Sequence, residues 1–243
     1  MLPDFDSLSE LYGRYRSGYS AELFEAVLVA CKPGPLDVLD LAAGTGLSAR
    51  GLQGRASSLV ACDIAPRMLA QNPASGRVVA RAEALPFRDA GFDLVACAQA
   101  FHWMVPDATY LELWRVLRRG GVAAIWWKYE AADDPTSRLC DEVVARVTGH
   151  APVHTDMARE ASLPGIEQSP FAGAVEEVRL VERLPFAAAT YVGYQASREL
   201  LRRAAGARRQ HVLEELRAAL EERHGDAPFE VAYLDRLCLL RKP

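Results

Sequence analysis

Short apolar runs alternate with helical patterns along the first half of the chain, and this alternation constrains the fold more than any other feature. Helix-compatible segments separate runs that suit buried strands. Near-continuous apolar strands are typical of a parallel sheet that helices cover on both faces. The alternation therefore predicts an α/β fold with a doubly wound parallel sheet. The five predicted strands are residues 36–42, 58–64, 77–82, 92–100 and 122–129.

Local signals mark the ends of the intervening helices. Residues 21–31 have helical spacing and stop at a Pro-Gly-Pro breaker. Pro66 suits the first turn of a short helix. Apolar residues recur at intervals of three and four along residues 107–118. We expect this helix to end at residues 118–121, because basic residues and glycine favour helix C-termini.

The alternation breaks after residue 129. Residues 130–173 hold a helix-like stretch followed by proline-containing loops. Strand character returns at 175–186 and at 229–242, and helical patterns fill 188–205 and 207–224 between them. No internal repeat or low-complexity tail is present, so we predict a single domain over the whole chain, residues 1–243.

Charge and composition exclude several kinds of partner. The net charge is −4 and charges of both signs are interspersed, whereas a nucleic-acid-binding protein more often has a basic excess. No run of about 18 apolar residues could span a membrane, and the polar N-terminus lacks the apolar region of a secretory signal. We expect a cytoplasmic protein without membrane or nucleic-acid partners, either a monomer or a homodimer.

The cysteines predict neither a disulfide framework nor a metal site. No CxxC pair occurs, and the histidines lack metal-ligand spacing around them. We expect five unpaired thiols and no bound metal. The cysteines are Cys31, Cys62, Cys97, Cys140 and Cys238.

A glycine-rich turn, Ala42-Ala43-Gly44-Thr45-Gly46, follows the first predicted strand and leads into a helix. Glycine at 44 and 46 lets a ligand approach the backbone and permits torsions that a β-carbon disfavours. Alone, this turn also fits a dinucleotide fingerprint, Gly44-x-Gly46-x-x-Ala49, or a tight turn that binds nothing.

Three neighbouring features favour a ligand-binding turn. Asp63 ends the second strand, nineteen residues after Gly44, where a carboxylate can accept hydrogen bonds from both ribose hydroxyls. Asp40 lies at the end of the first strand, where it can hold the turn or a ligand ammonium group. Glu83 and residues 85–87 follow the third strand, where we expect an adenine edge.

Four segments taken together resemble a known family. Residues 38–46 (VLDLAAGTG), 60–71 (VACDIAPRMLAQ), 81–104 and 114–125 are similar, in this order, to motifs of class I S-adenosylmethionine (SAM)-dependent methyltransferases of the type 11 kind. The string AQAFHW and residues 15–24 resemble a subgroup that includes trans-aconitate methyltransferase-like proteins. The resemblance is good over about residues 10–129 and weak beyond. It implies a Rossmann-like, seven-stranded sheet whose last strand is antiparallel.

The resemblance also implies a cofactor, SAM, with S-adenosylhomocysteine as its product, and a division of the chain. The SAM-binding core is expected at about 30–129 and an N-terminal lid at about 8–24. Helical insertions at about 130–173 and 188–224 are expected to cover the substrate.

Carried over residue by residue, the resemblance assigns parts of the cofactor to positions in this chain. The resemblance implies that the first strand and the turn bind the methionine part and that Asp63 binds the ribose. It implies that residues after the second and third strands bind the adenine. Many relatives have an aspartate where this chain has Arg81, and the N-terminal segment lacks the prolines of close relatives. The expected cofactor-binding residues are Arg16, Tyr19, Asp40, Ala42, Gly44, Gly46, Asp63, Ile64, Met68, Ala82, Glu83 and Gln99.

His102 is the candidate catalytic residue. It follows the fourth strand at the ligand end of the sheet, and an imidazole with a pKa near ~6.5 suits a general base. The alternative is a structural role, which we favour because an activated sulfonium methyl group needs a base only when the nucleophile must lose a proton.

Aromatic residues are the candidates for substrate contacts. Trp103 is expected in the pocket wall, and at least one of Trp126 and Trp127 should face the ligand end; we name Trp127. Tyr191 and Tyr194 share one helical face and either border the substrate or form a packing stripe, which is the commoner case. Arg198, Arg202 and Arg203 either recognise a carboxylate or form a solvated helix face, the commoner case for such a run.

The favoured function is methyl transfer from SAM to a small-molecule acceptor with an O, N or C nucleophile, including a carboxylate or a secondary metabolite. One alternative is a non-catalytic SAM-binding or regulatory protein of the same fold. A less favoured one is an NAD(P)-binding oxidoreductase, which would prefer a Tyr-x-x-x-Lys set that the chain lacks.

Overall fold

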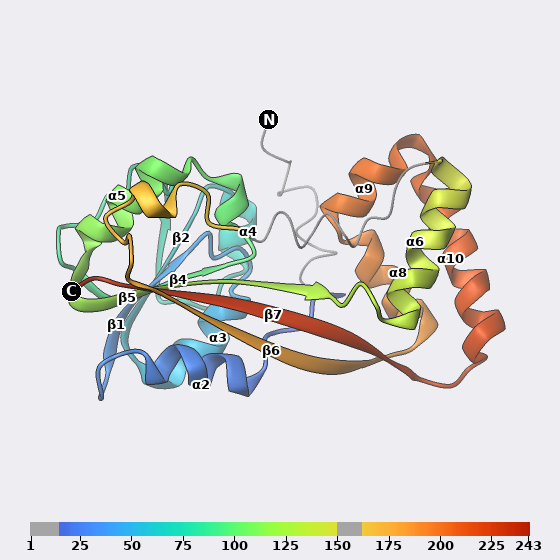
Figure 1. Cartoon of the computed structure of the whole chain (residues 1–243), viewed down its shortest axis with the longest axis horizontal. Coiled ribbons are helices and arrows are strands. Elements are labelled where there is room, and N and C mark those ends of the chain that lie inside the picture. Colours follow the sequence, from blue (N-terminus) through green and yellow to red (C-terminus); the bar gives the residue numbers. More distant parts are fainter. Residues whose placement is uncertain (1–14, 150–161) are drawn as a thin grey trace.

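The computed structural model describes residues 15–149 and 162–243. A sheet body continues at one end into a lobe of helices, and the longest strands connect the two (Figure 1). Of the predicted N-terminal lid, residues 8–14 lie outside the described residues.

Seven strands form one sheet in the order β3-β2-β1-β4-β5-β7-β6. Strands β1 to β5 pair in parallel, and β7 runs antiparallel to both β5 and β6. The predicted seven-stranded sheet with an antiparallel last strand is therefore confirmed. The strands are Leu36–Leu41 (β1), Ala56–Asp63 (β2), Gly76–Val79 (β3), Phe92–Ala98 (β4), Leu117–Glu130 (β5), Val175–Phe186 (β6) and Phe229–Arg241 (β7).

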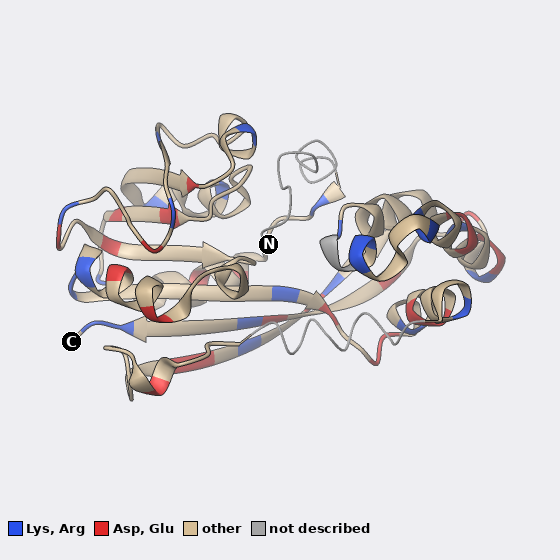
Figure 2. Ribbon diagram, turned by 90° about the horizontal axis from the view of Figure 1, so that it is seen from above, with Lys and Arg blue, Asp and Glu red and all other residues tan. Residues whose placement is uncertain are grey.

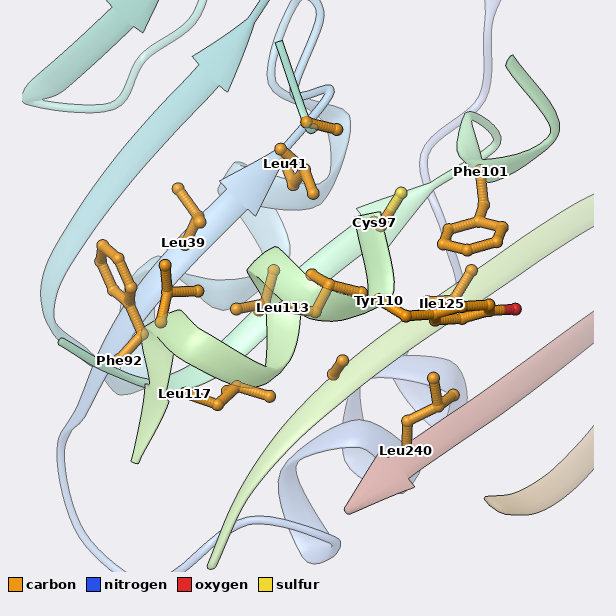
Figure 3. Close-up of a cluster of buried hydrophobic side chains, with 14 of the residues drawn as sticks. Leu39, Leu41, Phe92, Cys97, Phe101, Tyr110, Leu113, Leu117, Ile125 and Leu240 are labelled. Atoms are coloured by element: carbon orange, nitrogen blue, oxygen red, sulfur yellow. The ribbon is translucent and has the colours of Figure 1, made fainter. Parts of the chain in front are cut away.

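Helices cover both faces of the sheet, as the apolar strands require. In the body they are Ala21–Val29 (α2), Leu47–Leu52 (α3), Pro66–Ala70 (α4) and Pro106–Val116 (α5), with the short 3-10 turns Gln53–Arg55 (η2) and Phe101–Trp103 (η3). Ile125 and Trp127 of β5 face the cluster beneath α5, and Ala124 and Trp126 face the cluster beneath α2 and α3. Figure 3 shows the cluster beneath α5. The fold is therefore doubly wound.

One predicted helix boundary is wrong. The helix expected to end at residues 118–121 ends at Val116, and those residues begin β5. Leu117 pairs with Phe92, and Arg118 forms ion pairs with Asp37 and Asp93. These tertiary contacts outweigh the local C-terminal signal of the basic residues and glycines.

A lobe lies at the far end of the long strands. It contains Pro135–Thr148 (α6), Ala188–Ala196 (α8), Glu199–Ala205 (α9), the 3-10 turn Gly206–Arg208 (η5) and Arg209–His224 (α10). Its helices share a buried cluster with Phe186, Phe229 and Tyr233 from the ends of β6 and β7. The pattern predicted as one helix over 188–205 is divided at residues 197–198.

The segment predicted as one insertion, residues 130–173, divides in space. Its helix α6 joins the lobe, whereas the chain after residue 161 returns to the body, where Ile166–Gln168 (η4) precedes Phe171. Phe171 is fully buried and packs edge-on against Trp114 of α5. Among the described residues of this segment, only α6 therefore belongs to the lobe.

Charged residues of both signs are interspersed over the sheet body and the lobe (Figure 2). Over the described ranges, no helix is both long and apolar enough to cross a membrane. All five cysteines carry free thiols, as predicted.

Candidate functional site

The strand order reverses between β1 and β4, and the principal cavity opens where these two strands end. Ligands of open α/β sheets bind at this topological switch point. The cavity encloses about 1480 Å³ of empty space, including its solvent-filled mouth.

The glycine-rich turn forms one wall of the cavity, and its backbone has left-handed torsions. The φ angles are +54° at Ala42, +50° at Gly44 and +86° at Gly46. A β-carbon at Gly46 would lie 2.5 Å from Cδ of Pro73, so only glycine fits there. Ala42 and Gly44 line the cavity, whereas Gly46 caps α3 behind it.

Asp63 fixes the turn from the end of β2. Its Oδ2 accepts a hydrogen bond from the Gly44 N–H at 2.7 Å, and its Oδ1 accepts one from the Ala65 N–H at 2.7 Å. A carboxylate oxygen can accept more than one hydrogen bond. Asp63 therefore both shapes the cavity and lines it.

Asp40 lies behind the cavity and does not line it. It is fully buried, and its Oδ1 accepts a hydrogen bond from the Ser48 hydroxyl at 2.7 Å. Burial raises the pKa of the Asp40 carboxyl to about 7, despite the hydrogen bond from Ser48. Through Ser48, which does line the cavity, Asp40 positions the first turn of α3.

This raised pKa predicts a pH-dependent cost of burying Asp40. Between pH 4 and 7 the folded protein holds a proton that the unfolded chain releases, so stability falls as the pH rises through this window. Asp40→Asn is neutral at every pH. Its stability relative to wild type should increase by roughly 2–3 kcal/mol between pH 5 and pH 8, measured by urea unfolding. Asp89→Asn, at an exposed carboxylate, is the control, and an equal change in both variants contradicts the prediction.

Gln99 follows β4 in a left-handed conformation, with φ +57°. Its backbone N–H donates to the Trp126 carbonyl at 2.8 Å, and its side-chain Nε2 donates to the Lys128 carbonyl. The side-chain Oε1 is therefore the atom that suits a donor in the cavity, such as an ammonium group. A strained non-glycine residue held by two such bonds is typical of a functional position.

The next residues on this side are aromatic. His102 and Trp103 lie on η3 with ring centroids 4.7 Å apart, and both line the cavity. Nδ1 of His102 accepts a hydrogen bond from Nε1 of Trp127 at 3.1 Å. Neither Trp126 nor Trp127 lines the cavity, because each is fully buried in one of the two sheet clusters. The expectation that one of them faces the ligand is therefore wrong.

The lobe closes the cavity opposite the sheet. Tyr194 of α8 lines it, whereas Tyr191 is buried and donates its hydroxyl to Glu130 at 2.5 Å. Arg198 is 3% exposed and donates to Glu130 at 2.9 Å, so it does not belong to a solvated face. Arg203 of α9 lies over the Trp103 ring, 5.3 Å from its centroid, and joins lobe to body.

The N-terminal segment contributes two predicted residues. The Arg16 guanidinium lies over the Tyr194 ring at 5.2 Å, and Tyr19 packs edge-on against Trp126 at 5.4 Å. Both line the cavity, and the segment thereby touches the lobe and the body.

Residues after β3 form the remaining wall. Glu83 accepts a hydrogen bond from the Val105 N–H at 3.0 Å and pairs with Arg81 at 3.2 Å. Arg81 itself also lines the cavity.

Most predicted site residues come together around this one cavity. Those that line it are Arg16, Tyr19, Ala42, Gly44, Asp63, Ile64, Met68, Ala82, Glu83, Gln99, His102, Trp103 and Tyr194. Those that lie behind it are Asp40, Gly46, Trp127 and Tyr191.

Sequence reasoning did not select some lining residues, notably Thr45, Lys128 and Ser197. Lys128 is 5% exposed, and its ammonium group pairs with Glu182. A lysine inside the otherwise apolar run 122–129 was a usable signal, because buried lysines need a specific partner. Ser197 carried no comparable signal, since it lies at a break between two helices.

Fold and cavity together define a class. A doubly wound sheet with an antiparallel β7 and a cavity at the switch point is a Rossmann-like nucleotide-binding arrangement. The methyltransferase domain family matches residues 39–125, which include the turn, Asp63 and His102. The fold is that of the class I methyltransferases, and residues 39–125 form a methyltransferase domain of the matched family.

Individual relatives agree with this assignment. An uncharacterised methyltransferase of Mycobacterium tuberculosis (strain ATCC 25618 / H37Rv) is 37% identical over 131 residues, 52% of this chain and 53% of that protein. A demethylmenaquinone methyltransferase of Thermus thermophilus is 41% identical over 135 residues, 50% and 59% of the two chains. The chain spans about half the length of the curated relatives it matches.

A solved structure from Anaeromyxobacter dehalogenans, provisionally described as a type II methyltransferase, is similar over nearly the whole fold. Its TM-score is 0.63 at 24% identity, covering 93% of this chain and 98% of that one. This similarity covers a larger share of the chain than the sequence relatives do.

Proposed function

We propose that this protein transfers a methyl group from SAM to a small-molecule acceptor bound beneath the lobe. The observation that best supports this proposal is that one cavity has two chemically different halves. One half is formed by the glycine-rich turn and by Asp63, and the other by aromatic and basic side chains from η3 and the lobe. A donor and an acceptor could therefore lie side by side.

The residues of the first half fit SAM. Oγ1 of Thr45 is buried at the cavity without a hydrogen-bond partner among the described residues, as expected where a polar ligand would bind. Asp63 would accept the ribose hydroxyls, Ile64 and Met68 would flank the adenine, and Ala82 and Glu83 would meet its edge. Gln99 Oε1 would accept from the methionyl ammonium group. Bound SAM supplies an already activated sulfonium methyl group.

The chain's contribution to the reaction would be alignment and exclusion of water. Methyl transfer needs the nucleophile, methyl carbon and sulfur in line, and holding two reactants in that geometry supplies much of the rate enhancement. Arg16 and Tyr19 would close over the cofactor from the N-terminal segment. The lobe residues Tyr194 and Arg203 would cover the acceptor.

Isothermal titration with S-adenosylhomocysteine tests the proposal. We expect binding with a Kd in the micromolar range or tighter, and no heat from NADH at the same concentration. Clear NADH binding without S-adenosylhomocysteine binding would overturn the proposal. Turnover of SAM in the presence of candidate acceptors then separates an enzyme from a non-catalytic SAM-binding protein.

A further inference from the structure

Lys128 of β5 holds two elements that border the half of the cavity expected to bind the cofactor. Its side chain is buried and lines the cavity. The ammonium group donates to the Gly18 carbonyl at 3.2 Å and pairs with Glu182 of β6. The backbone carbonyl of Lys128 accepts a hydrogen bond from Nε2 of Gln99. One residue therefore fixes both the N-terminal segment and the Gln99 side chain.

Asp235 of β7 is a buried carboxylate beside this ammonium group. It is 1% exposed, and neither of its oxygens has a hydrogen-bond partner among the described residues. Asp235 stands opposite Lys128 in the ladder between β5 and β7. Opposite residues of an antiparallel pair share one face, with their β-carbons about 5 Å apart. Because a lysine side chain is long and flexible, the ammonium group can reach Asp235 by rotation of its own side chain.

Charged and titratable groups face this pair from several elements. Burial raises the pKa of the Asp235 carboxyl to about 6, while Lys128 lowers this pKa and Glu182 raises it. The Tyr233 ring on β7 lies with its centroid 5.5 Å from the ammonium nitrogen. Glu130, two residues further along β5, is paired with Arg198 of the lobe. The small cavity beside Lys128 is also lined by Arg16, Tyr19 and Tyr194.

Ionisation of Asp235 favours a second position for the ammonium group. A carboxylate that is buried without a donor is unfavourable, so it attracts the neighbouring cation. Gly18 is exposed, so water can replace the ammonium group at its carbonyl. We propose that Lys128 is a latch whose ammonium group exchanges between the Gly18 carbonyl and Asp235, and so holds or releases the N-terminal segment beside the cavity.

The latch makes Lys128 a positioning residue. It acts through the N-terminal segment, which carries Arg16 and Tyr19 into the cavity wall. The exchange is a property of the free protein, whereas its effect on the cofactor rests on the proposed function.

The direction of the pH dependence can be derived from the two positions. With the ammonium group at Gly18, Asp235 keeps its proton up to a pH of about 6. With the ammonium group beside Asp235, the pKa of this carboxyl is lower, because a nearby cation favours the charged form. Release of the segment is therefore coupled to release of a proton, and raising the pH from 5 to 8 favours the released form.

NMR of the free protein labelled with carbonyl-13C glycine and 15N-tyrosine tests the latch. A spectrum that correlates each tyrosine amide with the preceding carbonyl has two signals, because Gly-Tyr occurs only at Gly18-Tyr19 and Gly193-Tyr194. Gly18→Ala assigns the first signal, and its β-carbon would meet nothing within 4 Å. We expect the Gly18 carbonyl signal to move upfield between pH 5 and pH 8, with a midpoint near pH 6, as the hydrogen bond is lost. The Gly193 carbonyl accepts from the Ser197 N–H at 3.1 Å and should not respond.

Three variants make the assignment to Lys128 and Asp235 specific. Asp235→Asn cannot ionise, so its Gly18 signal should keep the low-pH position at every pH. Lys128→Met lacks the ammonium group and should show the released position at every pH. Asp40→Asn neutralises another buried carboxylate with a raised pKa and is the matched control, which should titrate like wild type. A Gly18 signal that does not respond to pH in wild type, or that titrates equally in Asp235→Asn, overturns the proposal; these two results decide if Lys128→Met does not fold.

A second measurement tests the effect on the cofactor site. The ratio of the Kd for S-adenosylhomocysteine at pH 8 to that at pH 5 should be about threefold to tenfold larger in wild type than in Asp235→Asn. Equal ratios overturn the role of Lys128 as a positioning residue. A failure of the proposed function would instead be seen as absent S-adenosylhomocysteine binding in both proteins, while the Gly18 signal of the free protein is still measurable.

Discussion

Replacing Asp63 with alanine is expected to weaken S-adenosylhomocysteine binding by about 100-fold or more. Hydrogen bonds to a charged group contribute about 1.5–3 kcal/mol each, and the proposed ribose contacts would be two such bonds. The variant also loses the acceptor for the Gly44 and Ala65 N–H groups, which holds the turn in its left-handed conformation. Isothermal titration of wild type and variant measures the change.

Two controls make this result specific. Asp63→Asn keeps one acceptor oxygen and the shape of the side chain but loses the charge, so its affinity should lie between those of wild type and the alanine variant. Asp89→Ala removes an exposed carboxylate outside the cavity and should leave affinity unchanged. An unchanged affinity in Asp63→Ala would mean that the cofactor does not contact this carboxylate.

The sheet could be predicted because a strand that is buried on both faces must consist mainly of apolar residues, and such runs are visible in the sequence. Each of β1, β4 and the inner part of β5 is an apolar run with few polar interruptions, so its existence did not depend on distant residues. The end of α5 was not predictable in the same way. Leu117 leaves the helix to pair with Phe92, and Arg118 is held by two aspartates that are distant in sequence.

The residues of the candidate site also differ in how well the sequence predicts them. The cavity residues close to the glycine-rich turn could be predicted from the sequence, because the motif there fixes both the turn and the strand end that border the cavity. The lobe was harder, because the same arginine pattern describes a solvated helix face or a buried ion pair. What turns Arg198 inward is Glu130, which is 68 residues away in the sequence. The contact of His102 with Trp127 likewise depends on the pairing of β4 with β5.

Glu130 should be among the most important residues for the stability of the lobe. It is 1% exposed at the end of β5, and its two oxygens accept hydrogen bonds from four described residues. The donors are Ser137, Tyr191, Gln195 and Arg198. They come from α6, from α8 and from the break after α8, so one carboxylate joins three parts of the lobe to the sheet.

Glu130→Ala is therefore expected to lower the free energy of unfolding by about 3–5 kcal/mol, because a buried guanidinium loses its counter-ion and three further donors lose their acceptor. Urea unfolding measures the loss, and hydrogen exchange should show it first in the amides of α8. The matched control is Arg146→Ala, which breaks the exposed pair between Arg146 and Glu215 at 2.8 Å, also within the lobe. That pair should contribute about 1 kcal/mol or less. Similar losses in both variants would contradict the role of Glu130, because a buried carboxylate with four donors would then contribute no more than one solvated ion pair.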